Sequence, residues 1–381
     1  MKLKILRKEE LNKSIAIVLG TRPGIIKFAP IIRRLEKRHI DYFIIHTGQH
    51  YSYNMDRKFF EELELPTPKY TNNRISKCKF HGEQTAEMLK SIEKALLKEK
   101  PSVVIVGGDA NTNLAGALAT RKLGITLVHL EAGLRSNEWN MPEEHNRVMI
   151  DHISDILLCP TEVARENLVK ENIKGKIFLT GNPIVDSIMD HLQLAEKSTI
   201  LKKIKIIPKN YFLLTFHREE NVDVKEKVQS FSECIQRLRT EYPWPIIFPI
   251  HPRTMARFQY FGIYDNLKKN KGLRLIKPVG YLDFLKLLSN ALLVLTDSGG
   301  IQEEACILNI PCVTLRENTE RPETVKIGAN IIASTEPERV IKAVNHFLYG
   351  LHKSDWKQPF GENCAKKIVD ILEKILNVGV K

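Results

Sequence analysis

A turn rich in glycine and positive charge follows the first apolar segment of the chain, at residues 20–27. Its glycines and proline leave backbone N–H groups free at the start of the next helix, and such groups attract anions. Arg22 adds a planar, permanently charged donor, and Lys27 lies about one helical turn further on. The turn therefore predicts an anion site, and the alternative is an ordinary strand-to-helix turn with surface cations. It lacks the G-x-G-x-x-G pattern, so bound NAD is not indicated.

Several carboxylates stand where the chain is expected to leave a strand or begin a helix. Asp109 follows a pair of glycines, Glu131 comes at the end of an apolar segment, and Glu143 begins a helix together with Glu144. A carboxylate at a strand end can act as an acid or a base. The alternative for Asp109 is a helix cap, and one of the two adjacent glutamates can serve only to favour the helix dipole.

The second half of the chain repeats this arrangement with a histidine and a phosphate-type turn. His217 ends an apolar segment and is a candidate acid, base or diphosphate donor, or alternatively a partly buried histidine with its hydrogen bonds satisfied. Ser298 with Gly299 and Gly300 opens a later helix, offering a hydroxyl and exposed amides to a phosphate, and Arg321 is placed to close that site. Anion sites combined with carboxylates fit a nucleotide-diphosphate substrate but do not name the reaction.

Short apolar segments that alternate with amphipathic helices must position these residues. The expected strands are 14–19, 42–45, 103–106, 125–129, 156–159, 177–180, 211–216, 245–250, 273–276, 292–295, 311–315 and 331–333. Fully apolar short strands between helices indicate parallel sheets covered on both faces. The fold class is therefore α/β, with two Rossmann-like doubly wound domains whose strand ends face a cleft.

The alternation weakens at residues 192–209, a lysine-rich stretch that contains Pro208, and then restarts. We therefore expect an N-terminal Rossmann-like domain at 1–188 and a C-terminal Rossmann-like domain at 189–358, which carries the phosphate-type turn. A last amphipathic helix occupies part of 359–381, and its packing partner does not follow from periodicity.

Composition excludes several classes of protein. The 381 residues include 58 basic and 45 acidic ones, a net charge of +13, but the basic residues form no stripe, so we expect neither nucleic-acid nor membrane binding. No apolar run approaches the length of a membrane span and the N-terminus does not resemble a signal peptide, which favours a cytoplasmic protein. The six cysteines form no C-x-x-C pair, so we expect reduced thiols and no metal site.

A set of short motifs resembles those of the UDP-N-acetylglucosamine 2-epimerase family, and the set spans residues 20–323. The motifs are Gly20-Thr21-Arg22-Pro23 with Lys27, Thr47-Gly48-Gln49-His50, Gly108-Asp109, His129-Leu130-Glu131-Ala132-Gly133-Leu134-Arg135, Pro142-Glu143-Glu144 with Asn146-Arg147, Gly181-Asn182, Thr215-Phe216-His217-Arg218-Glu219-Glu220-Asn221, Asp297-Ser298-Gly299-Gly300 with Gln302-Glu303-Glu304, and Glu320-Arg321-Pro322-Glu323. The resemblance implies a glycosyltransferase-B-type fold whose C-terminal helix packs back on the first domain. It also implies a homodimer, a UDP-sugar substrate and no cofactor.

The resemblance further implies roles for the matching positions. These are chemistry at Asp109, Glu131, Glu143 and His217, UDP binding at Ser298, Gly299, Gly300, Glu304 and Arg321, active-site cations at Arg22 and Lys27, and an allosteric UDP-sugar site of some bacterial members at Gln49, His50 and Gln84. Two positions depart from the family pattern, because Gly24 stands where Glu is usual and Ala110 where Thr is usual.

The implied reaction interconverts UDP-GlcNAc and UDP-ManNAc by eliminating UDP to give 2-acetamidoglucal and then adding UDP back. Hydrolysing relatives generally carry Ala-Asp after Thr-Arg, whereas this chain has Pro23-Gly24, which favours the non-hydrolysing type. A 2-epimerase for a UDP-2,3-diacetamido sugar, a glycosyltransferase of the same fold and a non-catalytic UDP-sugar sensor are competing hypotheses. The set of carboxylates argues against the glycosyltransferase.

Overall fold

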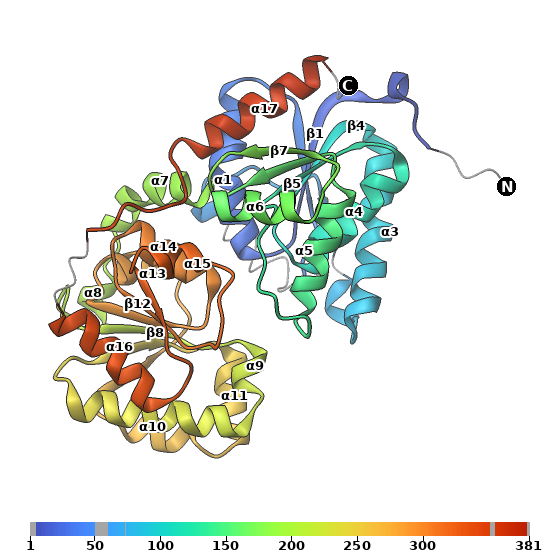
Figure 1. Ribbon diagram of the computed structural model, residues 1–381. Coiled ribbons are helices and arrows are strands. Elements are labelled where there is room, and N and C mark those ends of the chain that lie inside the picture. Colours follow the sequence, from blue (N-terminus) through green and yellow to red (C-terminus); the bar gives the residue numbers. More distant parts are fainter. Residues whose placement is uncertain (1–4, 50–59, 73, 351–354, 379–381) are drawn as a thin grey trace. The chain divides into compact units, whose positions relative to one another are not determined.

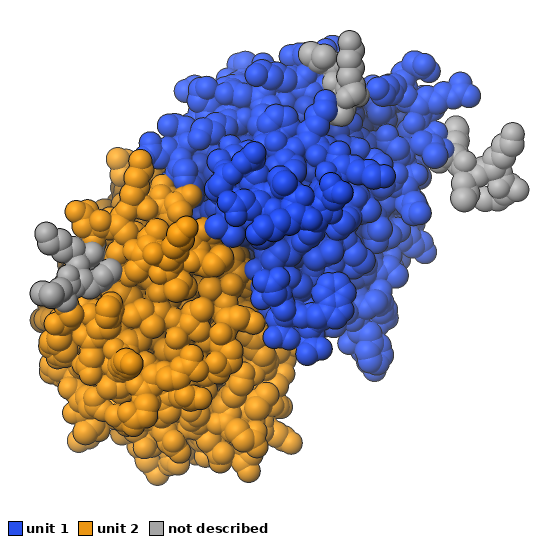
Figure 2. All heavy atoms as spheres, viewed as in Figure 1, with its two compact units in different colours: residues 1–187, 360–381 blue, residues 188–359 orange. Residues whose placement is uncertain are grey.

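The computed structural model describes residues 5–49, 60–72, 74–350 and 355–378 (Figure 1). The chain folds into two compact units, one of residues 1–187 with 360–381 and one of residues 188–359 (Figure 2). We call them unit 1 and unit 2.

Unit 1 is built on a seven-stranded parallel sheet in the order β3-β2-β1-β4-β5-β6-β7. The strands are β1 Asn12–Leu19, β2 Tyr42–His46, β3 Tyr70–Thr71, β4 Pro101–Gly107, β5 Thr126–Leu130, β6 Ile156–Cys159 and β7 Lys176–Leu179. Strand order reverses between β1 and β4, and polar residues beyond the carboxyl ends of such strands form ligand sites. Most residues of β1 and β4 are buried, as expected for strands covered on both faces.

Helices cover both faces of this sheet (Figure 1). They are α1 Arg22–Lys37, α3 His81–Glu99, α4 Asn111–Leu123, α5 Pro142–Ile153, α6 Glu162–Lys170 and α17 Cys364–Val378, with short 3₁₀ turns η1 Lys8–Glu10 and η2 Ile75–Lys77. A further helix, α7 Ile184–Glu196, runs through the point in the sequence where unit 1 ends and unit 2 begins. Gly116 lets α4 approach the sheet closely, because a Cβ atom there would lie 3.0 Å from Cγ1 of both Val18 and Val106.

The last helix, α17, packs against α1 within unit 1 (Figure 1). Arg38, which follows α1, contacts Asp370 at 2.5 Å and Glu373 at 2.8 Å. The apolar face of α17 is buried at Ile368 and Leu372. The chain therefore returns to its first sheet only after it has completed unit 2.

Unit 2 has a six-stranded parallel sheet in the order β10-β9-β8-β11-β12-β13, with its own reversal between β8 and β11. The strands are β8 Phe212–Thr215, β9 Ile246–Pro249, β10 Leu273–Ile276, β11 Leu293–Thr296, β12 Cys312–Thr314 and β13 Asn330–Ile332. The helices are α8 Ile200–Lys203, α9 Glu219–Val222, α10 Lys225–Glu241, α11 Pro252–Tyr260, α12 Tyr264–Lys269, α13 Tyr281–Ser289, α14 Gly299–Ile307, α15 Pro322–Lys326 and α16 Pro337–Tyr349. Its core includes stacked rings of Phe216 and Phe231, whose centroids are 4.1 Å apart.

The predicted strands all occur, and the α/β class with two doubly wound parallel sheets is confirmed. In the stretch 192–209, where the alternation weakens, α7 continues to Glu196 and the short helix α8 follows. The two-residue edge strand β3 was not predicted, since it is too short to show periodicity.

Two further structural facts concern membranes and cysteine. Among the described residues, no helix is both long enough and apolar enough to cross a membrane. All six cysteines lie in the described residues and form no disulfide.

Candidate active site

The first group of predicted residues lies at the carboxyl ends of β1, β4 and β5, beside the strand reversal of unit 1. Arg22 is the first residue of α1, whose N-cap Thr21 accepts a hydrogen bond from the amide of Gly24. Lys27 is buried on the same helix, and its Nζ lies 2.5 Å from Oε1 of Glu131. These residues are far apart in sequence and come together because β1 and β5 flank β4 in one sheet.

Glu131 is held in an unusual backbone conformation directly after β5. Its φ is +67°, a region that costs a non-glycine residue roughly 1–2 kcal/mol. The Glu131 side chain is 5% exposed, and its carboxylate pairs with Lys27 and accepts a hydrogen bond from Nδ2 of Asn182 at 3.2 Å. A strained, buried carboxylate with a fixed cationic partner is typical of a functional position.

Asp109 follows β4, and its side chain does not cap the next helix. The N-cap of α4 is Ala110, which makes no side-chain capping bond. The Asp109 carboxylate instead lies 2.5 Å from Nη2 of Arg147 and is 38% exposed. Its backbone carbonyl accepts a hydrogen bond from Nδ2 of Asn146 at 2.8 Å. The capping interpretation is therefore wrong, and Asp109 remains a partly exposed carboxylate beside a cation.

The adjacent glutamates of α5 have different environments. Glu144 is buried and accepts hydrogen bonds from the amides of Ser136 and Asn137 and from Arg147. Burial alone would raise the pKa of Glu144, but these hydrogen bonds and the charge of Arg147 lower it. Glu143 is half-buried, and its side chain makes no hydrogen bond or ion pair with any described residue. Glu144 thus anchors the loop before α5, whereas no such anchoring contact involves the side chain of Glu143 among the described residues.

Sequence reasoning gave no role to a buried charge network behind these residues. Nδ1 of His129 lies 2.7 Å from Asp151, and Nε2 lies 3.1 Å from the carbonyl oxygen of Gly108. Arg135 contacts the other oxygen of Asp151 at 2.7 Å. Burial alone would raise the pKa of Asp151, but the His129 and Arg135 contacts lower it. The network fixes the turn before Asp109, and its sequence signal was the pair His129 and Arg135 flanking Glu131.

In unit 2, His217 follows β8 and is oriented by a buried aspartate after β11. Nδ1 of His217 lies 3.1 Å from Oδ1 of Asp297, while the amides of His217 and Arg218 each donate to Oδ2 at 2.8 Å. Burial alone would raise the pKa of Asp297, but the His217 contact and these amides lower it. The His217 side chain is 40% exposed and can contact a ligand. Asp297 lies in one of the family-like motifs, but sequence reasoning gave it no role.

The phosphate-type turn forms the start of α14. Ser298 is its N-cap and makes no side-chain capping bond. A hydroxyl beside the first amides of a helix is the arrangement that anion sites commonly use. Glu304 is buried further along the same helix. A Cβ atom on Gly299 would lie 3.3 Å from Oε2 of Glu320 and 3.9 Å from Cζ of Arg321. Gly299 thus lies close to the Arg321 guanidinium, and Gly300 follows it in the first turn of α14.

Arginines beside this turn are themselves anchored. Nε of Arg321 donates to the buried carboxylate of Glu303. Arg316 donates to both oxygens of Glu320, at 2.9 and 3.0 Å. Burial alone would raise the pKa of Glu320, but the paired guanidinium of Arg316 holds it well below its usual range. The cations near the turn are therefore fixed before any anion binds.

The residues of the implied allosteric site are only partly described. Gln49 is half-buried, and its Oε1 accepts hydrogen bonds from the amide and the hydroxyl of Thr112, each at 2.9 Å. Gln84 is half-buried on α3. His50 lies outside the described residues. A site formed by these three side chains stays a prediction.

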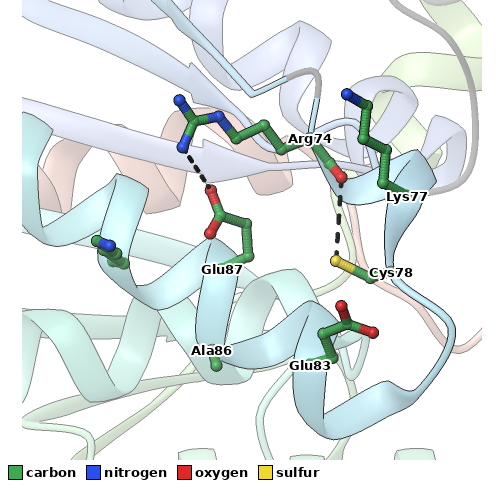
Figure 3. A pocket seen from close by; sticks show the side chains of 7 residues that line it. Arg74, Lys77, Cys78, Glu83, Ala86 and Glu87 are labelled. Carbon is green, nitrogen blue, oxygen red and sulfur yellow. Dashed lines mark hydrogen bonds and ion pairs between the residues drawn. The ribbon is translucent and has the colours of Figure 1, made fainter.

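A separate pocket of about 420 Å³ lies in unit 1 between η2 and the start of α3 (Figure 3). Its lining carries charges of both signs, and Arg74 contacts Glu87 at 3.9 Å across it. None of the predicted site residues lines this pocket. Among the described residues, no cluster of histidine, cysteine or carboxylate groups could hold a metal ion.

Comparison with known proteins agrees with these motifs. Residues 33–373 match the model of the family described as UDP-N-acetylglucosamine 2-epimerase. The chain is 56% identical over 363 residues to a UDP-N-acetylglucosamine 2-epimerase of Methanocaldococcus jannaschii, covering 94% of this chain and 98% of the relative. It is 37% identical to a UDP-2,3-diacetamido-2,3-dideoxy-D-glucuronate 2-epimerase of Pseudomonas aeruginosa, covering 95% and 99%.

A solved structure extends this likeness to three dimensions. The M. jannaschii UDP-GlcNAc 2-epimerase, crystallised in complex with UDP-GlcNAc and UDP, superposes with a TM-score of 0.89 at 55% identity, covering 95% of this chain and 99% of that one. Sequence motifs, sheet topology and full-length similarity therefore agree, and the chain belongs to the UDP-N-acetylglucosamine 2-epimerase family.

Proposed function

We propose that this protein is a non-hydrolysing UDP-N-acetylglucosamine 2-epimerase that interconverts UDP-GlcNAc and UDP-ManNAc. The observation that carries the proposal is full-length identity of 56% to a relative of that name. The chemistry of the strand ends supports it, since unit 1 presents carboxylates with cationic partners and unit 2 presents a phosphate-type turn.

The reaction must remove a proton from C2 of the sugar, which no carbonyl group activates. Expulsion of UDP builds positive charge at C1, and the C2 proton then becomes acidic enough for a carboxylate to accept. The C2–H electron pair forms the double bond of 2-acetamidoglucal, and the C1–O electron pair leaves with UDP. Return of a proton to the opposite face of C2, with re-addition of UDP at C1, gives the epimer. The scheme balances without a redox cofactor.

The residues of unit 1 supply the proton transfers in this scheme. Asp109, Glu131 and Glu143 are the candidate acids and bases, and a base on one face with an acid on the other meets the stereochemical need. Lys27 fixes the Glu131 carboxylate at 2.5 Å and balances its charge. Arg22, at the start of α1, is a cation for developing negative charge on the leaving group.

The residues of unit 2 supply diphosphate binding. The start of α14 offers Ser298 and the amides that follow it, and Arg321 is already anchored by Glu303. Fixed donors at the leaving group lower the barrier without reorganisation during the reaction. His217, oriented by Asp297, is a donor to the diphosphate or a proton carrier.

The reaction in heavy water, followed by NMR, tests this proposal. Purified protein with UDP-GlcNAc should produce UDP-ManNAc that carries deuterium at C2, because the carboxylates exchange with solvent while the glucal is held. Inversion without deuterium would contradict elimination by solvent-exchanging carboxylates. Accumulation of UDP with free N-acetylmannosamine would identify the hydrolysing reaction, and unchanged substrate at saturation would identify a UDP-sugar sensor.

A second candidate substrate is a UDP-2,3-diacetamido sugar. The identity of 37% to the P. aeruginosa relative favours it, as does Gly24, which removes the side chain usual at the turn after β1. Parallel measurement of kcat/KM for both sugars decides between them. A ratio above about tenfold in favour of the diacetamido sugar would replace the proposed substrate.

We also propose a homodimer in the cytoplasm, on the basis of the family resemblance. Light scattering should give about twice the 43.7 kDa mass of the chain. A monomer at micromolar concentration would contradict the dimer.

Activation by a second UDP-GlcNAc through Gln49, His50 and Gln84 would appear as a sigmoidal dependence of the reverse reaction on the concentration of that sugar nucleotide.

A further inference from the structure

Gln49 joins two strand-end turns of unit 1 that lie far apart in sequence. Its amide donates to the carbonyl oxygen of Gly20 at 3.1 Å, in the turn after β1. Its side-chain Oε1 accepts from the amide of Thr112 at 2.9 Å, in the first turn of α4. Gln49, in the loop after β2, therefore contacts the turns on both sides of the strand reversal, where β1 and β4 are neighbours.

The contact with Thr112 is a helix cap supplied from outside the helix. The first amides of a helix need acceptors, and an N-cap side chain usually provides one to the second or third helical residue. Here the N-cap is Ala110, which has no side-chain oxygen, and Thr112 is the second helical residue. The oxygen of Gln49 thus occupies the place that the missing capping oxygen would take.

The hydroxyl groups of Thr47 and Thr112 extend this cap into a chain of hydrogen bonds with a defined donor in each. The Thr112 hydroxyl lies 2.9 Å from Oε1 of Gln49, which can only accept, and 2.6 Å from the hydroxyl of Thr47. Thr112 therefore donates to Gln49, and Thr47 donates to Thr112. Gly20 leaves no space beside this chain, because a Cβ atom there would lie 2.0 Å from Oγ1 of Thr47. The contacts hold the two turns in one arrangement.

We propose that Gln49 is a positioning residue that replaces the missing cap at Ala110 and so sets Asp109 relative to the turn carrying Arg22. Asp109 directly precedes Ala110, the N-cap of the helix, and Gly20 lies two residues before Arg22 in the turn after β1. This role requires no second UDP-sugar at Gln49. Its effect on turnover rests on the proposed epimerase function.

A cycle of capping variants tests the proposal through kcat and KM for the heavy-water reaction. Gln49→Ala removes the acceptor and should lower kcat about tenfold, the size expected for one lost helix cap, with KM changed less than about twofold. Gln49→Glu keeps an acceptor oxygen and should retain most of the rate. Ala110→Thr supplies a cap within the helix, and the double variant Gln49→Ala/Ala110→Thr should recover to within about threefold of the wild-type rate.

The matched control removes a cap elsewhere in unit 1. Thr161 is the N-cap of α6 and accepts from the amide of Ala164 at 3.3 Å. Thr161→Ala should lower the melting temperature as Gln49→Ala does, with kcat unchanged. An equal loss of kcat in this control, or a double variant as slow as Gln49→Ala, would overturn the proposal.

Amide hydrogen exchange gives a readout that does not depend on catalysis. Gln49→Ala should speed exchange at residues 108–113, and Ala110→Thr should reverse that change. Unaltered exchange there, combined with lost activation by added UDP-GlcNAc, would overturn the positioning role and assign Gln49 to ligand binding. An inactive wild-type protein would overturn the proposed function instead, and the exchange measurement would still decide whether Gln49 caps α4.

Discussion

Units 1 and 2 share one scaffold but place different chemistry at the point where strand order reverses. In unit 1, carboxylates beyond β4 and β5 pair with the cations Arg147 and Lys27. In unit 2, the buried carboxylate of Asp297 accepts hydrogen bonds from backbone amides and orients His217, and the helix that follows has Ser298 at its N-cap without a side-chain capping bond. A parallel sheet thus fixes where a site forms, while the first residues after each strand decide what the site does.

The two units differ in which charged groups are held in place by partners of opposite charge. Unit 1 surrounds its candidate acids and bases with fixed cations, which suits proton transfer beside a departing anion. Unit 2 holds Arg321 with Glu303 and Arg316 with Glu320 beside the start of α14, where Ser298 makes no capping bond, which suits the proposed binding of a diphosphate. Variants at the two reversals should therefore separate turnover from binding.

The largest expected effect is on turnover in unit 1. Asp109→Asn and Glu131→Gln remove a proton acceptor while keeping side-chain shape, so each should lower kcat about 10²–10⁴-fold with little change in UDP affinity. Stopped assays of epimer formation measure the rate, and Glu166→Gln, an exposed position on α6, is the charge-matched control. Near-normal rates in both variants would remove these residues from the chemistry.

A smaller effect is expected on binding in unit 2. Ser298→Ala and Arg321→Ala remove donors to a diphosphate, and hydrogen bonds to charged groups contribute about 1.5–3 kcal/mol. Calorimetry should therefore show UDP affinity reduced about 10- to 100-fold. If UDP affinity stayed unchanged in both variants, unit 2 would lose its assignment as the diphosphate site.

Low pH should lower the folding stability of unit 2, because it protonates the carboxylate of Asp297. The pKa of Asp297 is lowered in the folded protein, so its stabilisation is present above the unfolded value of about 3.9 and is lost as pH falls through the folded value. Asp297→Asn should lower the free energy of unfolding by about 1–3 kcal/mol at pH 7, because the amide group accepts less well from the backbone N–H groups of His217 and Arg218. The variant should also lose less stability than the wild type as the pH falls below about 4. Urea unfolding at pH 7 and pH 3 measures both. An equally steep acid transition in the variant would contradict the role of Asp297.

The smallest effects are expected from adding a methyl group to the glycine at each turn, Gly24 after β1 in unit 1 and Gly299 after β11 in unit 2. Gly24 has no positive φ, so other residues can adopt its backbone conformation, and an added Cβ would lie 3.4 Å from its nearest atom. Gly24→Ala should therefore stabilise the protein by about 0.4–1 kcal/mol, because it reduces the conformational entropy of the unfolded chain. Gly299→Ala would place Cβ 3.3 Å from Glu320, which Arg316 clamps, and should lower stability and UDP affinity slightly. Thermal unfolding and calorimetry distinguish the two, and identical responses would remove the contrast between the turns.

Much of the fold was predictable because its signals are local. The short apolar run 156–159 coincides with β6, whose four residues are all buried, since a strand buried on both faces shows its burial in consecutive residues. The edge strand β3 and the four-residue helix α8 were missed, because such short elements carry too few residues for a period to emerge.

The sequence by itself determined the α/β class and which residues follow each strand. Only the tertiary structure decided which of them meet. Lys27 contacts Glu131 across 104 positions of the chain, Arg147 contacts Asp109, and Gln49 caps a helix that begins 62 residues later. The physical reason is that burial and helix periodicity act over a few neighbouring residues, whereas side-chain pairing depends on strand order. The reversal between β1 and β4 makes neighbours of strands that other elements separate in the chain.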